Sequence, residues 1–154
     1  MKNQESREIK IREFTDLVAW QKAHELAIDI YSATKKFPKE ELYGLTSQMR
    51  RAAVSISSNI AEGFGRIGYK EKMQFYYISH GSLTELKNQL LIARDIGCLA
   101  DEEFNHLDTV LIHVHRLLRG LLKKTSEILD CEPSGEKRAE RHSKFLIPNS
   151  KSDV

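Results

Sequence analysis

Residues 43–66, which read YGLTSQMRRAAVSISSNIAEGFGR, restrict the possible folds of this chain more than any other segment. Apolar side chains recur there, and just before it, at steps of three and four residues: Leu42, Leu45, Met49, Ala53, Ile56 and Ile60. At about 100° per residue these steps place them on one face of a helix. Most of the remaining surface is small rather than charged, so we expect neighbouring helices to approach this one closely on several sides.

Three further segments have the same helical period, and no segment alternates as a half-buried strand does. These helices are expected over residues 15–37, 70–96 and 101–130. The first begins at Thr15 or Asp16 and ends before Pro38, which cannot continue a helix. Asp101 is expected to cap the last helix, and Gly97 is expected to end the one before it.

Short connections make successive helices antiparallel, so the sequence predicts an all-α, up-down-up-down four-helix bundle over residues 14–130. Residues 1–13 and 131–154 are polar and are expected to be flexible tails. The N-terminus lacks the apolar run of a signal peptide, and no stretch is long enough to span a bilayer, so we expect a cytoplasmic protein without membrane contact. Cys98 and Cys131 are then expected to be reduced, buried thiols.

The glycine-rich sequence GFGRIG at residues 63–68 matches the letters of the dinucleotide-binding fingerprint. That fingerprint requires a preceding strand and a parallel sheet, which this chain does not predict. Here it joins two helices, so we interpret it as a turn whose glycines, with positive φ, end the helix that precedes it.

No arrangement of residues in the sequence points to catalysis, to a metal or to a cofactor. The six histidines lie outside any spaced Cys/His cluster. Glu103 and His106 have the i, i+3 spacing of a di-iron site, but such a site needs two copies, so we interpret them as a surface pair. His24 falls on an apolar stripe and is expected to be a core or interface histidine. The sequence therefore predicts a protein that is not an enzyme.

Basic residues form two clusters that could contact phosphates. Arg116, Arg119 and Lys123 share the outward face of the last helix, and Arg50 and Arg51 lie off the core stripe of the second. Both clusters are candidates for nucleic-acid binding. An alternative for the cluster of Arg50 and Arg51 is that the two arginines pair with an acidic side chain, such as that of Glu62 or Glu85.

Small and apolar side chains outside the core stripes are candidates for contact between chains. On the second and third helices they are Val54, Ser57, Ser58, Ala61, Met73, Tyr77 and Leu91. A ring of identical chains would repeat each basic cluster around its axis and so build a continuous positive zone.

Four separated blocks of sequence resemble the bacterial 23S rRNA intervening-sequence protein family. They are FTDLVAWQKAH at residues 14–24, YGLTSQMRRAA at 43–53, SNIAEGFGR at 58–66 and GSLTEL at 81–86. The resemblance implies a four-helix bundle that forms a homopentamer and is not an enzyme. Members are encoded within insertions in ribosomal RNA genes, and a related branch is the accessory variability protein of diversity-generating retroelements, which binds reverse transcriptase and nucleic acid. Gly68 and Ala100 depart from the helix-capping serines of the family.

Two functional hypotheses follow. The first is a non-enzymatic oligomer that binds RNA or DNA through its basic patches, as an accessory to a ribosomal RNA insertion or to a reverse transcriptase. The alternative is a protein-binding scaffold that makes no direct contact with nucleic acid. Neither hypothesis requires a cofactor.

Overall fold

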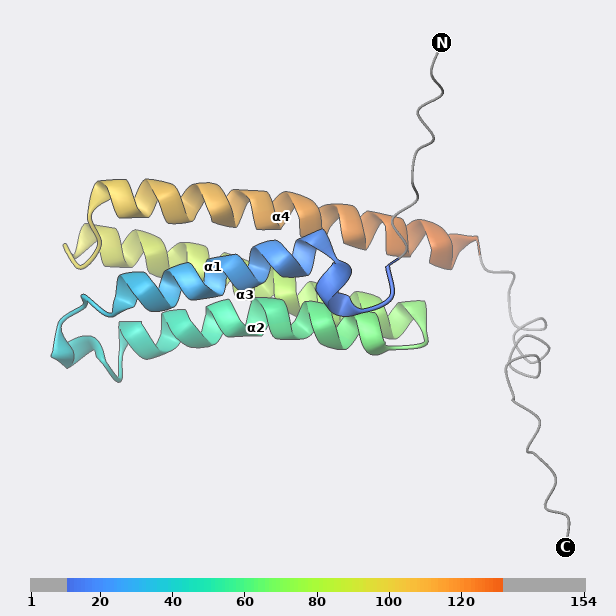
Figure 1. Ribbon diagram of the computed structural model, residues 1–154, viewed down its shortest axis with the longest axis horizontal. Helices are drawn as coiled ribbons and strands as arrows, with labels where there is room; N and C mark the ends of the chain where they lie inside the picture. The colour runs from blue at the N-terminus through green and yellow to red at the C-terminus, as the bar shows by residue number, and fades with distance from the viewer. Residues whose placement is uncertain (1–10, 132–154) are drawn as a thin grey trace, which may run out of the picture.

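The computed structural model describes residues 11–131, and most of this part of the chain is helical (Figure 1). The four long helices are α1 (Val18–Thr34), α2 (Leu45–Gly65), α3 (Tyr69–Asp95) and α4 (Asp101–Asp130). Two short 3₁₀ turns, η1 (Phe14–Asp16) and η2 (Lys39–Glu41), precede α1 and α2. The described residues contain no strand, so the predicted all-α class is confirmed. No helix among them is long and apolar enough to cross a membrane.

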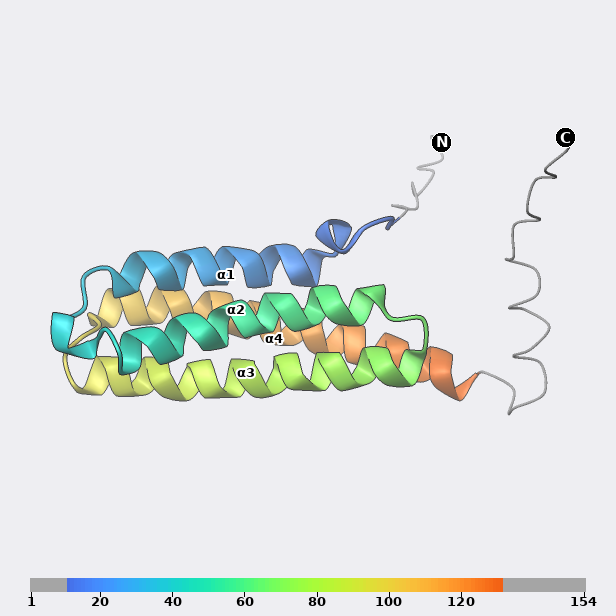
Figure 2. The same cartoon turned by 90° about the horizontal axis from the view of Figure 1, so that it is seen from below.

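The helices form the predicted antiparallel bundle. Each helix packs against two neighbours, in the circular order α1, α2, α3, α4, and successive helices run in opposite directions (Figures 1 and 2). The diagonal partners α2 and α4 therefore lie on opposite sides of the bundle (Figure 2). This placement decides which surface side chains can act together.

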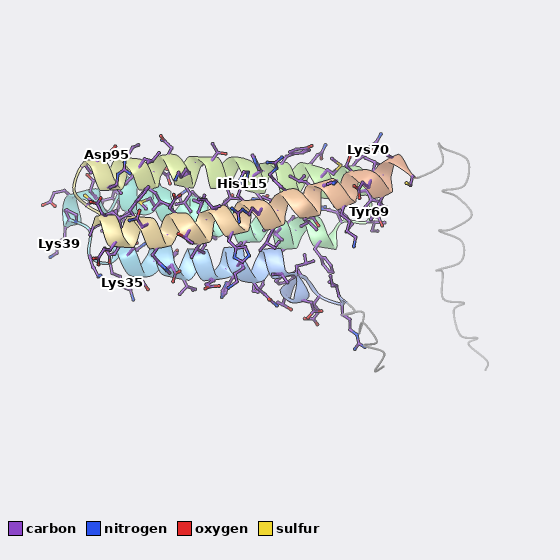
Figure 3. The ribbon with its side chains drawn as sticks, turned by 90° about the horizontal axis from the view of Figure 1, so that it is seen from above. Lys35, Lys39, Tyr69, Lys70, Asp95 and His115 are labelled. Atoms are coloured by element: carbon purple, nitrogen blue, oxygen red, sulfur yellow. The ribbon has the colours of Figure 1, made fainter. Side chains whose placement is uncertain are left out.

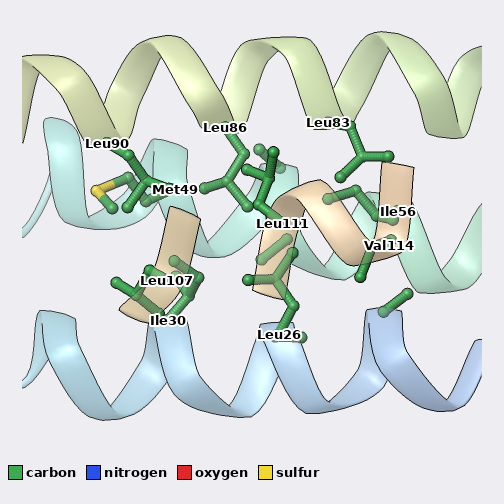
Figure 4. Packing of buried hydrophobic residues seen from close by; sticks show 14 of the residues in the cluster. Leu26, Ile30, Met49, Ile56, Leu83, Leu86, Leu90, Leu107, Leu111 and Val114 are labelled. Carbon is green, nitrogen blue, oxygen red and sulfur yellow. The ribbon is translucent and has the colours of Figure 1, made fainter. Parts of the chain in front are cut away.

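The core is formed by the apolar stripes of all four helices, as the sequence predicts (Figure 4). Fully covered side chains include Leu26, Ile30, Met49, Ile56, Leu86, Leu90 and Val114. The stripe of α2 weakens at its start, because Leu42 precedes the helix and is 47% exposed. Leu121 and Leu122 are half-buried and pack against this core.

The predicted starts of the first and last helices are wrong in detail. The carboxylate of Asp16 accepts from the backbone N–H groups of Arg12 at 2.8 Å and Glu13 at 3.0 Å, so it stabilises η1 rather than capping α1. These bonds lower the pKa of Asp16. The first helix accordingly begins only at Val18. At α4 the N-cap is Ala100, and Asp101 is instead the first helical residue. Its negative charge there interacts favourably with the positive end of the helix dipole.

The glycine turn also differs from the expectation. Of the glycines in the described residues, only Gly97 has a positive φ, of 81°, and it ends α3 from the position after the C-cap residue, Ile96. The Cys98 N–H donates to the Ala93 carbonyl there, at 2.9 Å. Gly63 lies inside α2, and its role is close packing, because a Cβ atom at that position would lie 2.6 Å from Cε1 of Tyr76.

Small polar residues bring α2 and α3 close together. The hydroxyl of Ser79 is buried and donates to the carbonyl of Ile56 at 2.9 Å. One turn along the interface, the hydroxyls of Ser55 and Ser82 form a hydrogen bond at 2.8 Å. A small residue of α2, Ser55, therefore does face another helix on this side, whereas a contact through Val54, Ser57, Ser58 and Ala61 stays a prediction.

Candidate nucleic-acid interface

A groove of about 760 Å³ crosses the outward side of α2. We call it the α2 groove. Tyr31 contributes to it from α1, Ser82 and Glu85 from α3, and the rest comes from α2 and the segment before it: Leu42, Tyr43, Thr46, Ser47, Gln48, Arg50, Arg51, Ala52, Val54 and Ser55.

Arg50 is held in place by α1. Its Nε atom donates to the hydroxyl of Thr34 at 2.9 Å, and its guanidinium lies 4.8 Å from the centre of the Tyr31 ring. Thr34 is buried and in turn donates to the carbonyl of Ile30 at 2.8 Å. Arg50 therefore bridges α1 and α2 and also presents a fixed positive charge at the edge of the groove.

Arg51 differs from its neighbour, because it is exposed and forms no ion pair with any of the described residues. The sequence left open a pairing of either arginine with Glu62 or Glu85. Glu62 instead pairs with Arg66, and Glu85 accepts a hydrogen bond from Gln89 at 3.0 Å. The charge of Arg51 is thus available to an external anion.

Two further side chains give the groove chemical character. Tyr43 precedes α2 and is 91% exposed, so its ring faces open solvent beside the groove. Thr46 is only 3% exposed, and its hydroxyl has no hydrogen-bond partner among residues 11–131. Buried threonines deeper in helices, such as Thr125, donate to the carbonyl four residues earlier. Thr46 lies in the first turn of α2, where residue 42 is not yet helical.

The predicted basic cluster on α4 lies outside the α2 groove. Arg116, Arg119 and Lys123 are all exposed, and the Nζ atom of Lys123 is 3.9 Å from a carboxylate oxygen of Glu127. Because α4 is diagonal to α2, these residues lie on the opposite side of the bundle from Arg50 and Arg51 (Figure 2). Within residues 11–131 the two predicted clusters therefore form separate surfaces and not a single continuous one.

The residues predicted to contact another chain are covered to different extents. Val54, Ser58 and Tyr77 are exposed, with exposed fractions of 42% for Val54 and 59% for Tyr77. Half-buried positions are Ala61, Met73 and Leu91, and Leu91 packs against the core. Ser57 is buried within the chain. The homopentamer stays a prediction, and the exposed members of the set are the ones able to form such a contact without rearrangement.

Sequence reasoning missed a pair of histidines between α3 and α4. The Nε2 atoms of His80 and His115 lie 2.9 Å apart, and both rings are half-buried (Figure 3 labels His115). Burial, together with the nearby His80 and Arg119, lowers the pKa of His115. The two residues are 35 positions apart, so only the register between antiparallel helices could have revealed the pair.

The structure also bears on the expectations for His24, for the two cysteines, and for Glu103 with His106. His24 is exposed and stacks on Trp20 with ring centres 4.9 Å apart, so it is not a core histidine. Cys98 is half-buried and Cys131 is exposed, so neither is the buried thiol that we expected. His106 does lie at the surface, but it contacts Asp29 of α1, at 3.2 Å, while Glu103 pairs with Lys36. Residues 11–131 hold no group of three or more potential metal ligands.

These features define a small antiparallel helical bundle with a basic groove on one side. The family model described as "23S rRNA-intervening sequence protein" matches residues 15–120. The chain therefore belongs to the 23S rRNA-intervening sequence protein family, as its sequence motifs predict.

A solved structure shares the fold. It is a protein of unknown function from the S23 ribosomal protein family of Bacteroides thetaiotaomicron. The two chains are 20% identical, with a TM-score of 0.65, and the match covers 69% of this chain and 96% of the other. At that identity the likeness supports the fold alone. A comparison with curated protein sequences found no match.

Proposed function

We propose that this protein is a non-enzymatic binding protein that contacts single-stranded nucleic acid through the α2 groove. The observation that carries the proposal is the combination, in one groove, of an almost fully exposed tyrosine with an arginine and a buried hydroxyl that have no ion-pair or hydrogen-bond partner, respectively, among residues 11–131. Proteins that bind single strands combine positive charge along the backbone path with aromatic rings on which bases stack.

The phosphate contact is assigned to the side of the groove near α1. Arg50 is fixed against Tyr31 on that side, and Arg51, the next residue of α2, is exposed and forms no ion pair with any described residue, so a phosphate can approach these charges without first breaking an ion pair. The opposite wall carries the carboxylate of Glu85, which repels phosphate. The backbone of a bound strand therefore follows the α1 side.

The base contact is assigned to Tyr43 and to the polar wall from α3. A ring that is 91% exposed offers its face to an unstacked base, which a duplex does not present. Ser82 and Glu85 line the groove and can hydrogen-bond to base edges, because hydroxyls donate and accept and a carboxylate accepts from amino groups. The groove thus favours single strands over paired ones.

The basic surface of α4 is proposed as a second, independent phosphate contact. It lies on the far side of the bundle, so it can hold a distant part of a long strand or a neighbouring strand. Self-association would repeat both surfaces and strengthen binding by multivalency.

The test is fluorescence anisotropy with a short, mixed-sequence single-stranded RNA, and the matching DNA, over a range of salt concentrations. Arg51→Gln is expected to weaken binding and to reduce the slope of log affinity against log salt by about 0.7, the value for one phosphate contact on a single strand. Tyr43→Ala is expected to cost about 1–3 kcal/mol with little change of slope. Both side chains are exposed, so thermal melting should be unchanged.

The comparison variant is Arg116→Gln combined with Lys123→Gln. It removes two charges from the opposite side and should leave binding of a short strand nearly unchanged. If this variant loses affinity while Arg51→Gln does not, the α4 surface is the binding site and the groove assignment is wrong. No binding of either strand by the wild type at physiological salt would instead favour a protein-binding scaffold.

A further inference from the structure

The histidine pair between α3 and α4 has the geometry of a metal chelate. His80 and His115 come from neighbouring antiparallel helices, and their Nε2 atoms are 2.9 Å apart. The ring planes are tilted by 48°, with centres 4.9 Å apart, so the rings meet at their edges and do not stack. Only one proton can lie between two such nitrogens, so at least one presents a lone pair to the other.

The nitrogen separation distinguishes between coordination geometries. Imidazole nitrogens lie about 2.0–2.1 Å from a bound first-row cation, so two ligands at 90° to each other are about 2.9 Å apart. Two ligands of a tetrahedral cation would be about 3.4 Å apart. The observed separation of 2.9 Å equals that of two ligands at 90°, as in square-planar and octahedral sites, and it is also the length of the hydrogen bond between the two rings, so a cation would take the place of the shared proton. Such sites suit Ni²⁺ and Cu²⁺ better than Zn²⁺.

The surroundings allow such a cation to bind. Both histidines are half-buried, so water can reach the remaining coordination positions. Arg119 acts electrostatically on His115 from one helical turn away, and its charge opposes the binding of a cation. This opposition predicts that removal of the arginine charge strengthens binding.

We propose that His80 and His115 form a two-histidine site for a late first-row divalent cation of the Ni²⁺ and Cu²⁺ class, which links α3 to α4. The site is separate from the nucleic-acid groove, because neither His80 nor His115 lines that groove. Binding at the site stabilises the folded chain, since the two ligands are brought together only in the bundle.

The probe is Ni²⁺, titrated calorimetrically into the untagged full-length protein without chelator. The wild type is expected to bind one ion per chain at its tightest site, and Ni²⁺ should raise the melting temperature. Loss of a side chain that only hydrogen-bonds to a metal ligand typically weakens metal binding by roughly 10-fold or more. Loss of His80 or His115 should weaken Ni²⁺ binding by more than roughly 10-fold, because each is a ligand itself. His80→Ala and His115→Ala test this expectation, and His80→Gln and His115→Gln serve if an alanine variant folds poorly.

The matched control is His113→Ala. His113 is exposed and lies two positions from His115 on the same helix, so its ring is directed elsewhere. This variant should bind Ni²⁺ like the wild type, and Arg119→Gln should bind it more tightly. Equal losses in the His113 and His115 variants, or the absence of saturable binding to the wild type, would overturn the proposal.

Discussion

Replacement of Ile56 by alanine is expected to lower the free energy of unfolding by about 2–5 kcal/mol. Ile56 has no exposed surface and lies at the centre of the core, between α2 and the facing helices (Figure 4). Its removal eliminates buried apolar area and leaves a cavity that close-packed neighbours fill only in part. Urea denaturation followed by circular dichroism measures the change as a shift of the midpoint at constant slope.

The control for this substitution is the same change at Ile78. That side chain lies on α3 and is 52% exposed, so its truncation removes little buried area. We expect the free energy of unfolding to change by no more than about 0.5 kcal/mol. If the two isoleucines prove equally sensitive, Ile78 is covered in solution, and the surface of α3 is part of a contact between chains.

Gly63→Ala is expected to destabilise the protein, although alanine is the better helix former. The added Cβ would lie 2.6 and 2.9 Å from two ring carbons of Tyr76 and 3.1 Å from Cβ of Phe75. Tyr76 is only 2% exposed, so its ring has little room to move aside. Overpacking of this kind costs about 1–3 kcal/mol and forces α2 away from α3.

The contrasting variant is Gly120→Ala, also within a helix. In the described part of the chain, apart from its two neighbours and the backbone of its own helix, nothing lies within 4 Å of the Cβ that this change adds. It should therefore gain up to about 1 kcal/mol from helix propensity alone. Chemical denaturation of the two variants should move in opposite directions, and a stable Gly63→Ala protein would show that α2 and α3 are less closely packed than described.

The sequence was sufficient for the fold because the core depends on periodicity. Stripes such as Met49, Ile56 and Ile60 have a period of about 3.6 residues, and each must be covered by another helix. Short connections then leave few topologies. Helix ends were less predictable. Asp16 and Asp101 are both good capping residues, and their roles depend on which backbone N–H groups lie nearby, which the sequence does not specify.

The candidate site could be predicted only in part. Arg50 and Arg51 stood out in the sequence because they interrupt a surface of small residues, but their different roles depend on Tyr31 and Thr34 of another helix. Among the described residues the Thr46 hydroxyl has no partner, and this is likewise a consequence of where α2 begins. The separation of the two basic clusters follows from the circular order of the helices, which no local pattern encodes.

Ultraviolet cross-linking of the bound, single-stranded RNA to the wild-type protein, followed by mass spectrometry of the peptides, tests the proposed function most directly. It requires no substitution and reports which side of the bundle touches a base. The exposed ring of Tyr43 is expected to carry the main adduct, with the others confined to the peptides that line the α2 groove. Adducts found only on peptides of α4, around Arg116 and Lys123, would contradict the account.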